Sequence, residues 1–205
     1  MMSLKPWPSW MHHALQGITY WIGHRRCFYR NYPLSEGALV AEVCNLIHSN
    51  LPDDLTLKCE VQYSDLLGDI PRPDELTERA RADLVVFNKP TEEDDESVPM
   101  CIIEVKRAAA PNSQINADLR RLAAVLDLLP SVRMFLFVIS EAQRPVHFVN
   151  AEGHSILGKR QIPHPKGYYR VRRTWKAAHA YTKRERAHYA CLIEVFAPPA
   201  ARSHI

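Results

Sequence analysis

The chain has 205 residues, of which 46% are hydrophobic and 24% are charged, as in a folded globular protein of one sizeable domain. No run approaches the ~20 apolar residues of a membrane span, and the five cysteines lack the CxxC spacing of zinc and redox sites. The seven glycines form no phosphate-binding loop, which argues against an NTPase. We therefore expect a reduced, cytoplasmic protein without a membrane anchor.

The net charge of +3 hides an uneven distribution along the chain. Residues 1–30 have four Lys or Arg and no acid, residues 31–157 have eleven against twenty-one Asp or Glu, and residues 158–186 have ten against one. Basic ends around an acidic middle are typical of a protein that binds cations at its centre and a polyanion at its flanks. A solvated basic face without a partner is the alternative.

Two helices are predicted first. Aromatic and basic residues over 10–32 indicate a helix that ends near Pro33. Ser35 is placed to cap a second helix over 36–51. The apolar residues of this second helix recur at helical spacing and are Leu39, Val40, Val43, Leu46 and Ile47.

Two carboxylates of this second helix are expected to face different ways. Glu36 falls at the centre of the apolar arc when each residue advances ~100°, whereas Glu42 lies about a quarter-turn or more outside it. Glu36 is therefore expected to point inward. A carboxylate in the first turn also interacts favourably with the helix dipole, so a purely structural role for Glu36 stays open.

Four strands and one further helix complete the predicted core. Residues 55–67 alternate with period two, and apolar strands follow at 82–88 and 100–108. The acidic loop TEEDDES joins the last two, so we expect them to be antiparallel. A helix over 116–130 then leads to an apolar strand within 133–142, and such a helical crossover makes the strands on either side of it parallel. The result is a mixed sheet sandwiched by helices.

Beyond the core, three more strands are predicted over 146–157, 167–177 and 188–196, as an appended sheet or an extension of the first. The run CLIEVF at 191–196 resembles CIIEVK at 101–106, with Phe196 where the earlier run has a lysine. A glutamate in an apolar run is compatible with plain structure, such as an edge strand that has one wet face. Because the lysine is missing from the later run, we predict no site there.

The earlier run places charges where a buried strand does not tolerate them alone. Glu104 and Lys106 share one face of the strand, because side chains alternate. A buried carboxylate needs a cation, which is Lys106, a metal ion or both. Asp83 begins the preceding strand and meets this end of its partner if the two form a hairpin. Two carboxylates and an ammonium suit phosphodiester hydrolysis, because hard oxygen ligands hold Mg²⁺, which polarises phosphate and activates water.

This arrangement resembles the PD-(D/E)XK nuclease superfamily. The motif consists of Asp83 in RADLVVF and, about twenty residues later, Glu104-Val105-Lys106 in IIEVKR, and the element order matches over residues 33–140. The resemblance implies an α/β, restriction-endonuclease-like fold, with a mixed central sheet of core order αβββαβ flanked by helices and, here, extra C-terminal strands. Ala82 stands where the family often has Pro, and the literal Pro-Asp of RPDE lies in a loop without a strand after it.

The resemblance also implies roles for the motif residues. Asp83, Glu104 and the backbone carbonyl of Val105 would ligate Mg²⁺, with Mn²⁺ as a substitute. Lys106 would assist the attacking water. An acidic residue of the first core helix commonly completes such a site, and here that residue is Glu36, with Glu42 as the alternative.

Three polar residues of the following helix are candidates for the same site: Gln114, Asp118 and Arg121. Charges on a helix surface and a capping residue explain these three better, and we predict that outcome.

Basic residues at both ends are candidates for nucleic-acid contact, because Lys and Arg bind phosphates and aromatic side chains stack on bases. A basic strand with one wet face is the alternative explanation of the later group. The candidates are Arg25, Arg26, Lys159, Arg160, Arg170, Arg172, Arg173 and Lys176, interleaved with Tyr168, Tyr169 and Trp175.

We expect a single domain over 1–205, with a helical, basic and aromatic extension at 1–32, a catalytic core at 33–142 and a basic β extension at 143–205. The predicted function is a Mg²⁺-dependent endo- or exonuclease that hydrolyses DNA phosphodiester bonds in bacterial or phage restriction, defence or repair. The alternatives are a catalytically inactive nucleic-acid-binding or assembly subunit of this fold, and a nuclease acting on RNA or branched DNA. A homodimer and partner subunits of a larger system are both open, and no membrane partner is expected.

Overall fold

The computed structural model describes residues 7–29, 32, 34–90, 97–141, 143–163, 167–178 and 187–197. The acidic residues of the TEEDDES loop, together with Arg30 and Pro33, lie outside these ranges. The elements in chain order are α1 (Ser9–Phe28), α2 (Glu36–His48), β1 (Leu55–Gln62), α3 (Tyr63–Leu67), β2 (Arg81–Asn88), β3 (Pro99–Arg107), α4 (Asn112–Leu128), β4 (Arg133–Ser140), β5 (Arg160–Gln161), β6 (Tyr168–Ala178) and β7 (Ala187–Phe196).

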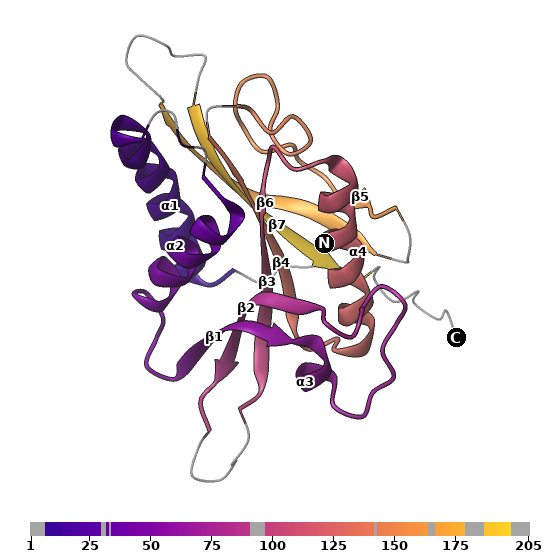
Figure 1. The fold of residues 1–205 in the computed structure, drawn as a ribbon. Helices are drawn as coiled ribbons and strands as arrows, with labels where there is room; N and C mark the ends of the chain where they lie inside the picture. The colour runs from indigo at the N-terminus through magenta and orange to yellow at the C-terminus, as the bar shows by residue number, and fades with distance from the viewer. Residues whose placement is uncertain are drawn as a thin grey trace, which may run out of the picture.

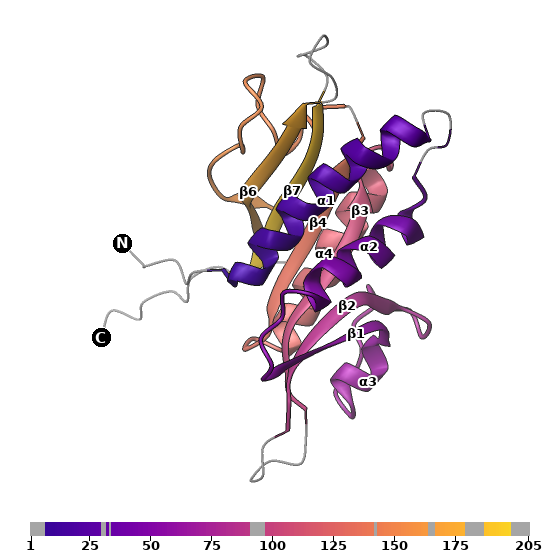
Figure 2. The same ribbon diagram turned by 90° about the vertical axis from the view of Figure 1, so that its left-hand side faces the viewer.

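The described strands form one sheet of seven strands in the order β1-β2-β3-β4-β7-β6-β5. Strands β3 and β4 are parallel, as a helical crossover requires, and the other neighbouring pairs are antiparallel. Figures 1 and 2 show α1 and α2 together on one face of the sheet and α4 on the other. The predicted α/β class, mixed sheet and core order αβββαβ are confirmed, with only the short α3 added between β1 and β2.

The sheet separates two apolar cores. The core between the sheet and α4 includes Val85, Ile102, Leu119, Leu122, Leu136 and Ile193. The core between the sheet and the helices α1 and α2 includes Leu15, Leu39, Val43, Ile103, Phe135 and Leu192. Strands β2, β3, β4 and β7 contribute to both cores, so they are the buried part of the sheet. In the part of the chain that the structure describes, no helix is long and apolar enough to cross a membrane.

Helix ends follow local chemistry. The Ser35 hydroxyl accepts a hydrogen bond from the Ala38 N–H at 3.2 Å, so it caps α2 as predicted. Helix α4 begins at Asn112, four residues before the predicted start at 116, directly after the extended Pro111. The first helix ends at Phe28, before the predicted end near Pro33.

Three expectations about strands were wrong. The predicted strand over 55–67 ends at Gln62, and α3 takes its last residues. Residues 146–157 form turns with one isolated bridge between Val149 and Ser155. The run at 191–196 belongs to β7, which lies between β4 and β6 and is therefore not an edge strand. An apolar run without alternation does not reveal how many neighbours a strand has.

We expect the Ser35→Ala substitution to lower the free energy of unfolding by about 1 kcal/mol, because the first turn of α2 loses its cap. Ser35→Asp keeps an oxygen acceptor and should remain close to the parent. Urea denaturation of the three proteins measures this, and an alanine variant as stable as the parent would contradict the capping role.

Candidate functional site

Asp83 lies where β2 and β3 separate. The last paired residues of this ladder are Leu84 and Ile103. Beyond them, the Asp83 carboxylate accepts a hydrogen bond from the Val105 N–H at 2.7 Å, in the place of a backbone acceptor. The end of the strand ladder therefore fixes the position of this carboxylate.

The strand beside this point is irregular. Glu60 has φ of +52°, the left-handed conformation that residues other than glycine rarely adopt. It lies on β1 between the pairs Cys59↔Leu84 and Val61↔Ala82, and is thus opposite Asp83. Backbone strain of this kind concentrates at functional sites. Burial raises the pKa of Asp83, and the negative charge of Glu60 adds to the rise, whereas the hydrogen bond from Val105 opposes it.

Glu104 is buried at the centre of the site, with 2% of its surface exposed. Its carboxyl accepts hydrogen bonds from the Tyr63 hydroxyl at 2.6 Å and from the Arg121 guanidinium at 3.3 Å. Burial raises the pKa of Glu104 to about 8, and the negative charge of Asp83 contributes to the rise. At neutral pH this carboxyl therefore holds a proton much of the time.

Lys106 reaches two other carboxylates. Its ammonium donates to Glu36 at 2.7 Å and forms an ion pair with Asp118 at 3.2 Å. Burial by itself lowers the pKa of Lys106, but the hydrogen bond to Glu36 and the charge of Asp118 together raise it above its ordinary value. The side chain is thus a charged ammonium held in a fixed place.

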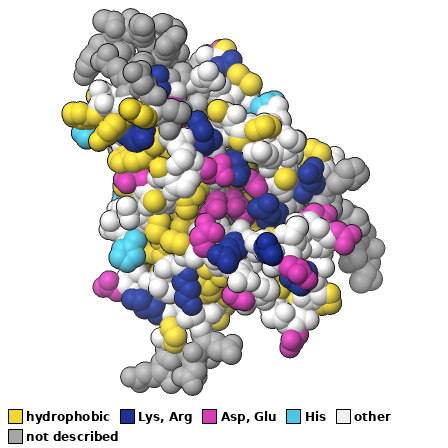
Figure 3. All heavy atoms as spheres, in the orientation of Figure 1, with side chains coloured by type: hydrophobic (Ala, Val, Ile, Leu, Met, Phe, Trp, Pro, Cys, Tyr) yellow, Lys and Arg dark blue, Asp and Glu magenta, His cyan; other side chains and the backbone are white. Residues whose placement is uncertain are grey.

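Arg121 connects Glu104 with the ion pair between Lys106 and Asp118. Its guanidinium lies 3.3 Å from Glu104 and 3.2 Å from Asp118. Burial by itself lowers the pKa of Arg121, and the charges of those two acids raise it. Figure 3 shows acidic side chains gathered near the middle of one face of the molecule, with basic side chains beside them.

The structure brings four predicted residues into one network, namely Asp83, Glu104, Lys106 and Glu36. Val105 contributes its N–H to Asp83, as described above. Glu42 is half-buried farther along α2, and Lys106 pairs with Glu36. Gln114 is exposed, as expected for a helix surface.

The prediction that Asp118 and Arg121 are surface charges was wrong. Asp118 is 3% exposed, and it continues the buried face formed by Ile115 and Leu119. Its place on that apolar arc is a signal in the sequence that identifies an inward acid. Tyr63 was not predicted at all, because the strand before it was expected to continue through 67.

Two carboxylates of this site are ligands of the kind that Mg²⁺ prefers, since the ion usually binds through one or two carboxylates and keeps several waters. Among the residues described, no group of three His, Cys, Asp or Glu side chains lies close enough to ligate one ion. Burial raises the pKa of both Asp83 and Glu104, and each carboxyl also influences the pKa of the other, so the two lie close together. A positive charge between them is therefore favourable. The donor set fits a water-rich Mg²⁺ ion rather than a cage of protein ligands.

The predicted nucleic-acid-binding residues do not gather in one place. Arg25 and Arg26 lie in the last turn of α1, where Arg26 is 3.9 Å from Glu141. The others belong to β5, β6 and the residue before β5. Among these, Lys159, Arg173 and Lys176 are exposed, Arg160 donates to the carbonyl of His147, and Arg170 and Arg172 contact Glu194.

Comparisons with known proteins give limited information. No protein-family model matches the chain, and no curated protein sequence matches it. Among solved structures, P. aeruginosa ATCC27853 NucC in its cAAA-bound form is similar, with a TM-score of 0.34 and 16% sequence identity. The similarity covers 60% of this chain and 52% of that one, so the chain spans about half the length of that protein.

We expect the pH dependence of stability to report on Glu104. Its pKa in the folded protein is about 8, above its ordinary value of 4.5. A raised acid pKa stabilises the fold fully below the unfolded value, and that contribution is lost as pH rises through the folded value. Urea denaturation of the metal-free protein from about pH 5 to about pH 9 should show this decline relative to Glu104→Gln. A constant difference between the two proteins would contradict it.

We expect Tyr63→Phe to lower the free energy of unfolding by about 1–3 kcal/mol, because the buried carboxyl of Glu104 loses a hydrogen-bond donor. The phenylalanine ring keeps the packing of the tyrosine ring, so the loss reports on the hydroxyl. Tyr20→Phe is the matched control, since Tyr20 is 65% exposed on α1. Thermal or urea denaturation of both variants measures the difference, and equal stability of the two variants would exclude a role for the buried hydroxyl.

Proposed function

We propose that this protein is a Mg²⁺-dependent nuclease that hydrolyses phosphodiester bonds of DNA. The observation that carries the proposal is the adjacency of Asp83 and Glu104 at the separating ends of β2 and β3, with the ammonium of Lys106 on the same strand as Glu104. A half-buried carboxylate next to a buried one, both with raised pKa values, is typical of functional sites.

The metal ligands in this proposal are Asp83, Glu104 and the backbone carbonyl of Val105. When bound, Mg²⁺, or Mn²⁺ in its place, polarises the phosphate and lowers the pKa of a bound water. Ligation requires ionised carboxylates, so Glu104 must release the proton that its burial favours. The Tyr63 hydroxyl and the Arg121 guanidinium stabilise the ionised form by donating to it.

The raised pKa of Lys106 decides its role. Burial would lower this pKa, but Glu36 and Asp118 outweigh burial and keep the side chain protonated at neutral pH. A protonated amine cannot accept a proton from water. Lys106 therefore acts as a donor that orients the attacking water and stabilises negative charge on the phosphate. Glu36 and Asp118 hold the ammonium in position from two different helices.

Basic residues near this site are suited to contact the nucleic-acid backbone. Arg107 follows Lys106 on β3, and its side chain is 34% exposed. Arg26 has a side chain that is 30% exposed, and both arginines lie within 4 Å of Glu141. Half-exposed arginines that share one carboxylate retain positive charge for a phosphate. We expect these two to bind DNA close to the scissile bond.

One site cuts one strand, so cleavage of both strands would need a homodimer or two successive nicks. We infer a cytoplasmic role in restriction, defence or repair of bacterial or phage DNA, acting with or without partner subunits. A nuclease acting on RNA or branched DNA uses the same chemistry and differs only in the nucleic acid that it binds.

One contact favours a second candidate function. Arg121 already donates to Glu104 at 3.3 Å and thus supplies a positive charge next to a metal-binding carboxylate. A protein that no longer uses a metal would keep such a substitute cation. That protein would be a catalytically inactive nucleic-acid-binding or assembly subunit of the same fold.

We expect purified protein to cleave plasmid, linear or single-stranded DNA with Mg²⁺ or Mn²⁺, and to lose cleavage with a chelator. Lys106→Ala should lower the rate by about a hundredfold or more, because a preorganised donor is removed from the transition state. Lys89→Ala is the matched control, since Lys89 is exposed at the far end of β2.

The substrate arms of this experiment separate the candidates. Cleavage of RNA or of branched DNA in preference to linear DNA would support the variant nuclease. Binding of DNA without metal-dependent cleavage would support the inactive subunit. Cleavage that Lys106→Ala leaves unchanged would overturn the proposed catalytic site.

A further inference from the structure

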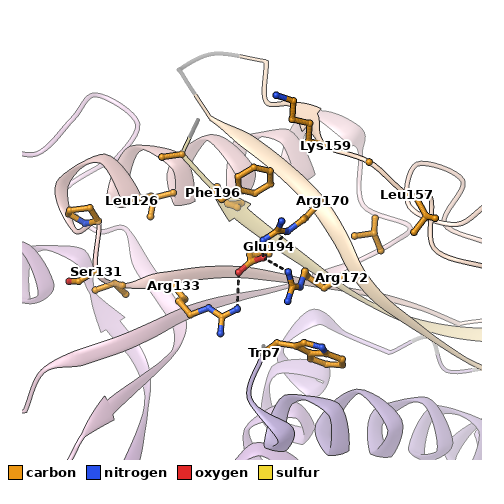
Figure 4. A pocket seen from close by; sticks show the side chains of 16 residues that line it. Trp7, Leu126, Ser131, Arg133, Leu157, Lys159, Arg170, Arg172, Glu194 and Phe196 are labelled. Atoms are coloured by element: carbon orange, nitrogen blue, oxygen red, sulfur yellow. Dashed lines mark hydrogen bonds and ion pairs between the residues drawn. The ribbon is translucent and has the colours of Figure 1, made fainter. Parts of the chain in front are cut away.

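A second buried glutamate gathers three arginines on the opposite face of the sheet. Glu194 of β7 is 7% exposed. Its carboxylate accepts from Arg133 at 2.8 Å and from Arg170 at 2.6 Å, and it lies 3.3 Å from Arg172. Figure 4 shows these three guanidinium groups converging on Glu194 from β4 and β6. The expectation that the run at 191–196 carries no site does not account for this cluster.

Among the residues that the structure describes, three arginines surround one carboxylate in this cluster. Burial raises the pKa of Glu194, but the hydrogen bonds from Arg133 and Arg170 outweigh burial and lower it, so the group is a carboxylate at neutral pH. Burial lowers the pKa of Arg172, and the charges of the other two arginines lower it further despite Glu194. Glu194 therefore holds the three guanidinium groups close together at one place in the sheet.

A cavity of about 930 Å³ opens beside the cluster. Arg133, Arg170, Arg172 and Glu194 line it, together with Lys159, whose exposed ammonium adds a fourth cation. This volume lies in the range of small-molecule sites.

Two aromatic rings, those of Phe196 and Trp7, line the same cavity. The Arg170 guanidinium lies 4.6 Å from the centre of the Phe196 ring. The rings of Tyr168 and Phe196 stack, with their centres 6.1 Å apart. The Lys159 ammonium lies 4.7 Å from the Tyr168 ring. Figure 4 shows Trp7 at the edge of the cavity, across from Arg172. A half-buried tryptophan at the mouth of a cationic cavity offers a flat surface to a planar ring.

This cavity is separate from the candidate nuclease site. Glu194 shares its face of β7 with Leu192 and Ala190, which pack in the core under α1 and α2. Glu104 shares its face of β3 with Ile102, which packs under α4. Strand β4 lies between these two strands. A ligand at one site therefore does not occupy the other.

We propose that this cavity binds a phosphate-bearing ligand with a planar ring, of the nucleotide class. The guanidinium groups of Arg133, Arg170 and Arg172 present forked donors that match the oxygens of a phosphate. Lys159 supplies a further charge at the mouth, and Trp7 stacks on the ring. Glu194 orients the arginines when no ligand is bound. The site goes beyond the proposed nuclease activity and does not depend on it.

Titration calorimetry with the full chain tests this proposal. The probes are the mononucleotides AMP, GMP, CMP and UMP, with inorganic phosphate and adenosine as the separate halves of one of them. At least one mononucleotide should bind, and it should bind about tenfold or more tightly than phosphate or the nucleoside alone. Absence of binding by every mononucleotide, or affinity no better than that of free phosphate, would overturn the proposal.

Variants identify the site. Lys159→Gln changes an exposed side chain that does not contact Glu194, so the fold should persist. This variant and Arg170→Gln should each weaken mononucleotide binding about tenfold or more, because each removes a charged partner of the phosphate. Lys89→Gln, which lies outside the cavity, and Asp83→Asn, which lies in the candidate nuclease site, should bind as the parent does. Parental affinity in Lys159→Gln and Arg170→Gln would overturn the assignment.

Glu194→Gln provides an independent test. Without the carboxylate, the arginines repel one another, so the melting temperature should fall. The same change removes the charge that opposes a bound phosphate, so the tightest mononucleotide should raise the melting temperature more in this variant than in the parent. If the arginines serve only to compensate Glu194, the nucleotide leaves both melting temperatures unchanged, and the proposal fails.

Discussion

The buried carboxyl of Glu104 is the constraint on which the site depends. A carboxylate removed from water costs several kcal/mol unless charges and donors compensate it. The protein compensates with a hydroxyl from α3, a guanidinium from α4 and a proton retained at a pKa of about 8. These partners come from elements that are far apart in the chain. The arrangement of the helices around β3 therefore determines the chemistry at the end of that strand.

The same tripeptide, Ile-Glu-Val, occurs on β3 and on β7 and reaches opposite electrostatic states. On β3 burial and a neighbouring aspartate raise the pKa of Glu104, whereas on β7 the hydrogen bonds of surrounding arginines overcome burial and lower that of Glu194. Among the described residues, acids outnumber cations around Glu104, whereas three arginines surround the single carboxylate of Glu194. Neighbouring elements, rather than the local sequence, decide the charge around each glutamate, and on this difference rest our proposals of a cation on one face and an anion on the other.

Much of the core was predictable because periodicity and a helical crossover determine element type and strand direction. Asp83, Glu104 and Lys106 could be placed near one another for the same reason. Tyr63 could not, since the change from strand to helix after Gln62 depends on how α3 packs under the sheet. To predict that Asp118 and Arg121 face the site, one would have to know how α4 is rotated about its axis. The arginine cluster required the pairing of β7 with β4, two strands separated by about fifty residues of chain.

The position of β7 in the sheet has a consequence for how the chain reaches its fold. This strand is the last of the described strands in sequence, yet it lies between β4 and β6. Until β7 is synthesised, one edge of β4, which is apolar from Met134 to Ile139, has no partner, and an exposed apolar edge invites pairing with other chains. Long-range pairing of this kind slows folding. The nascent protein thus carries an aggregation-prone edge from the synthesis of β4 until that of β7, and insertion of β7 between β4 and β6 removes it.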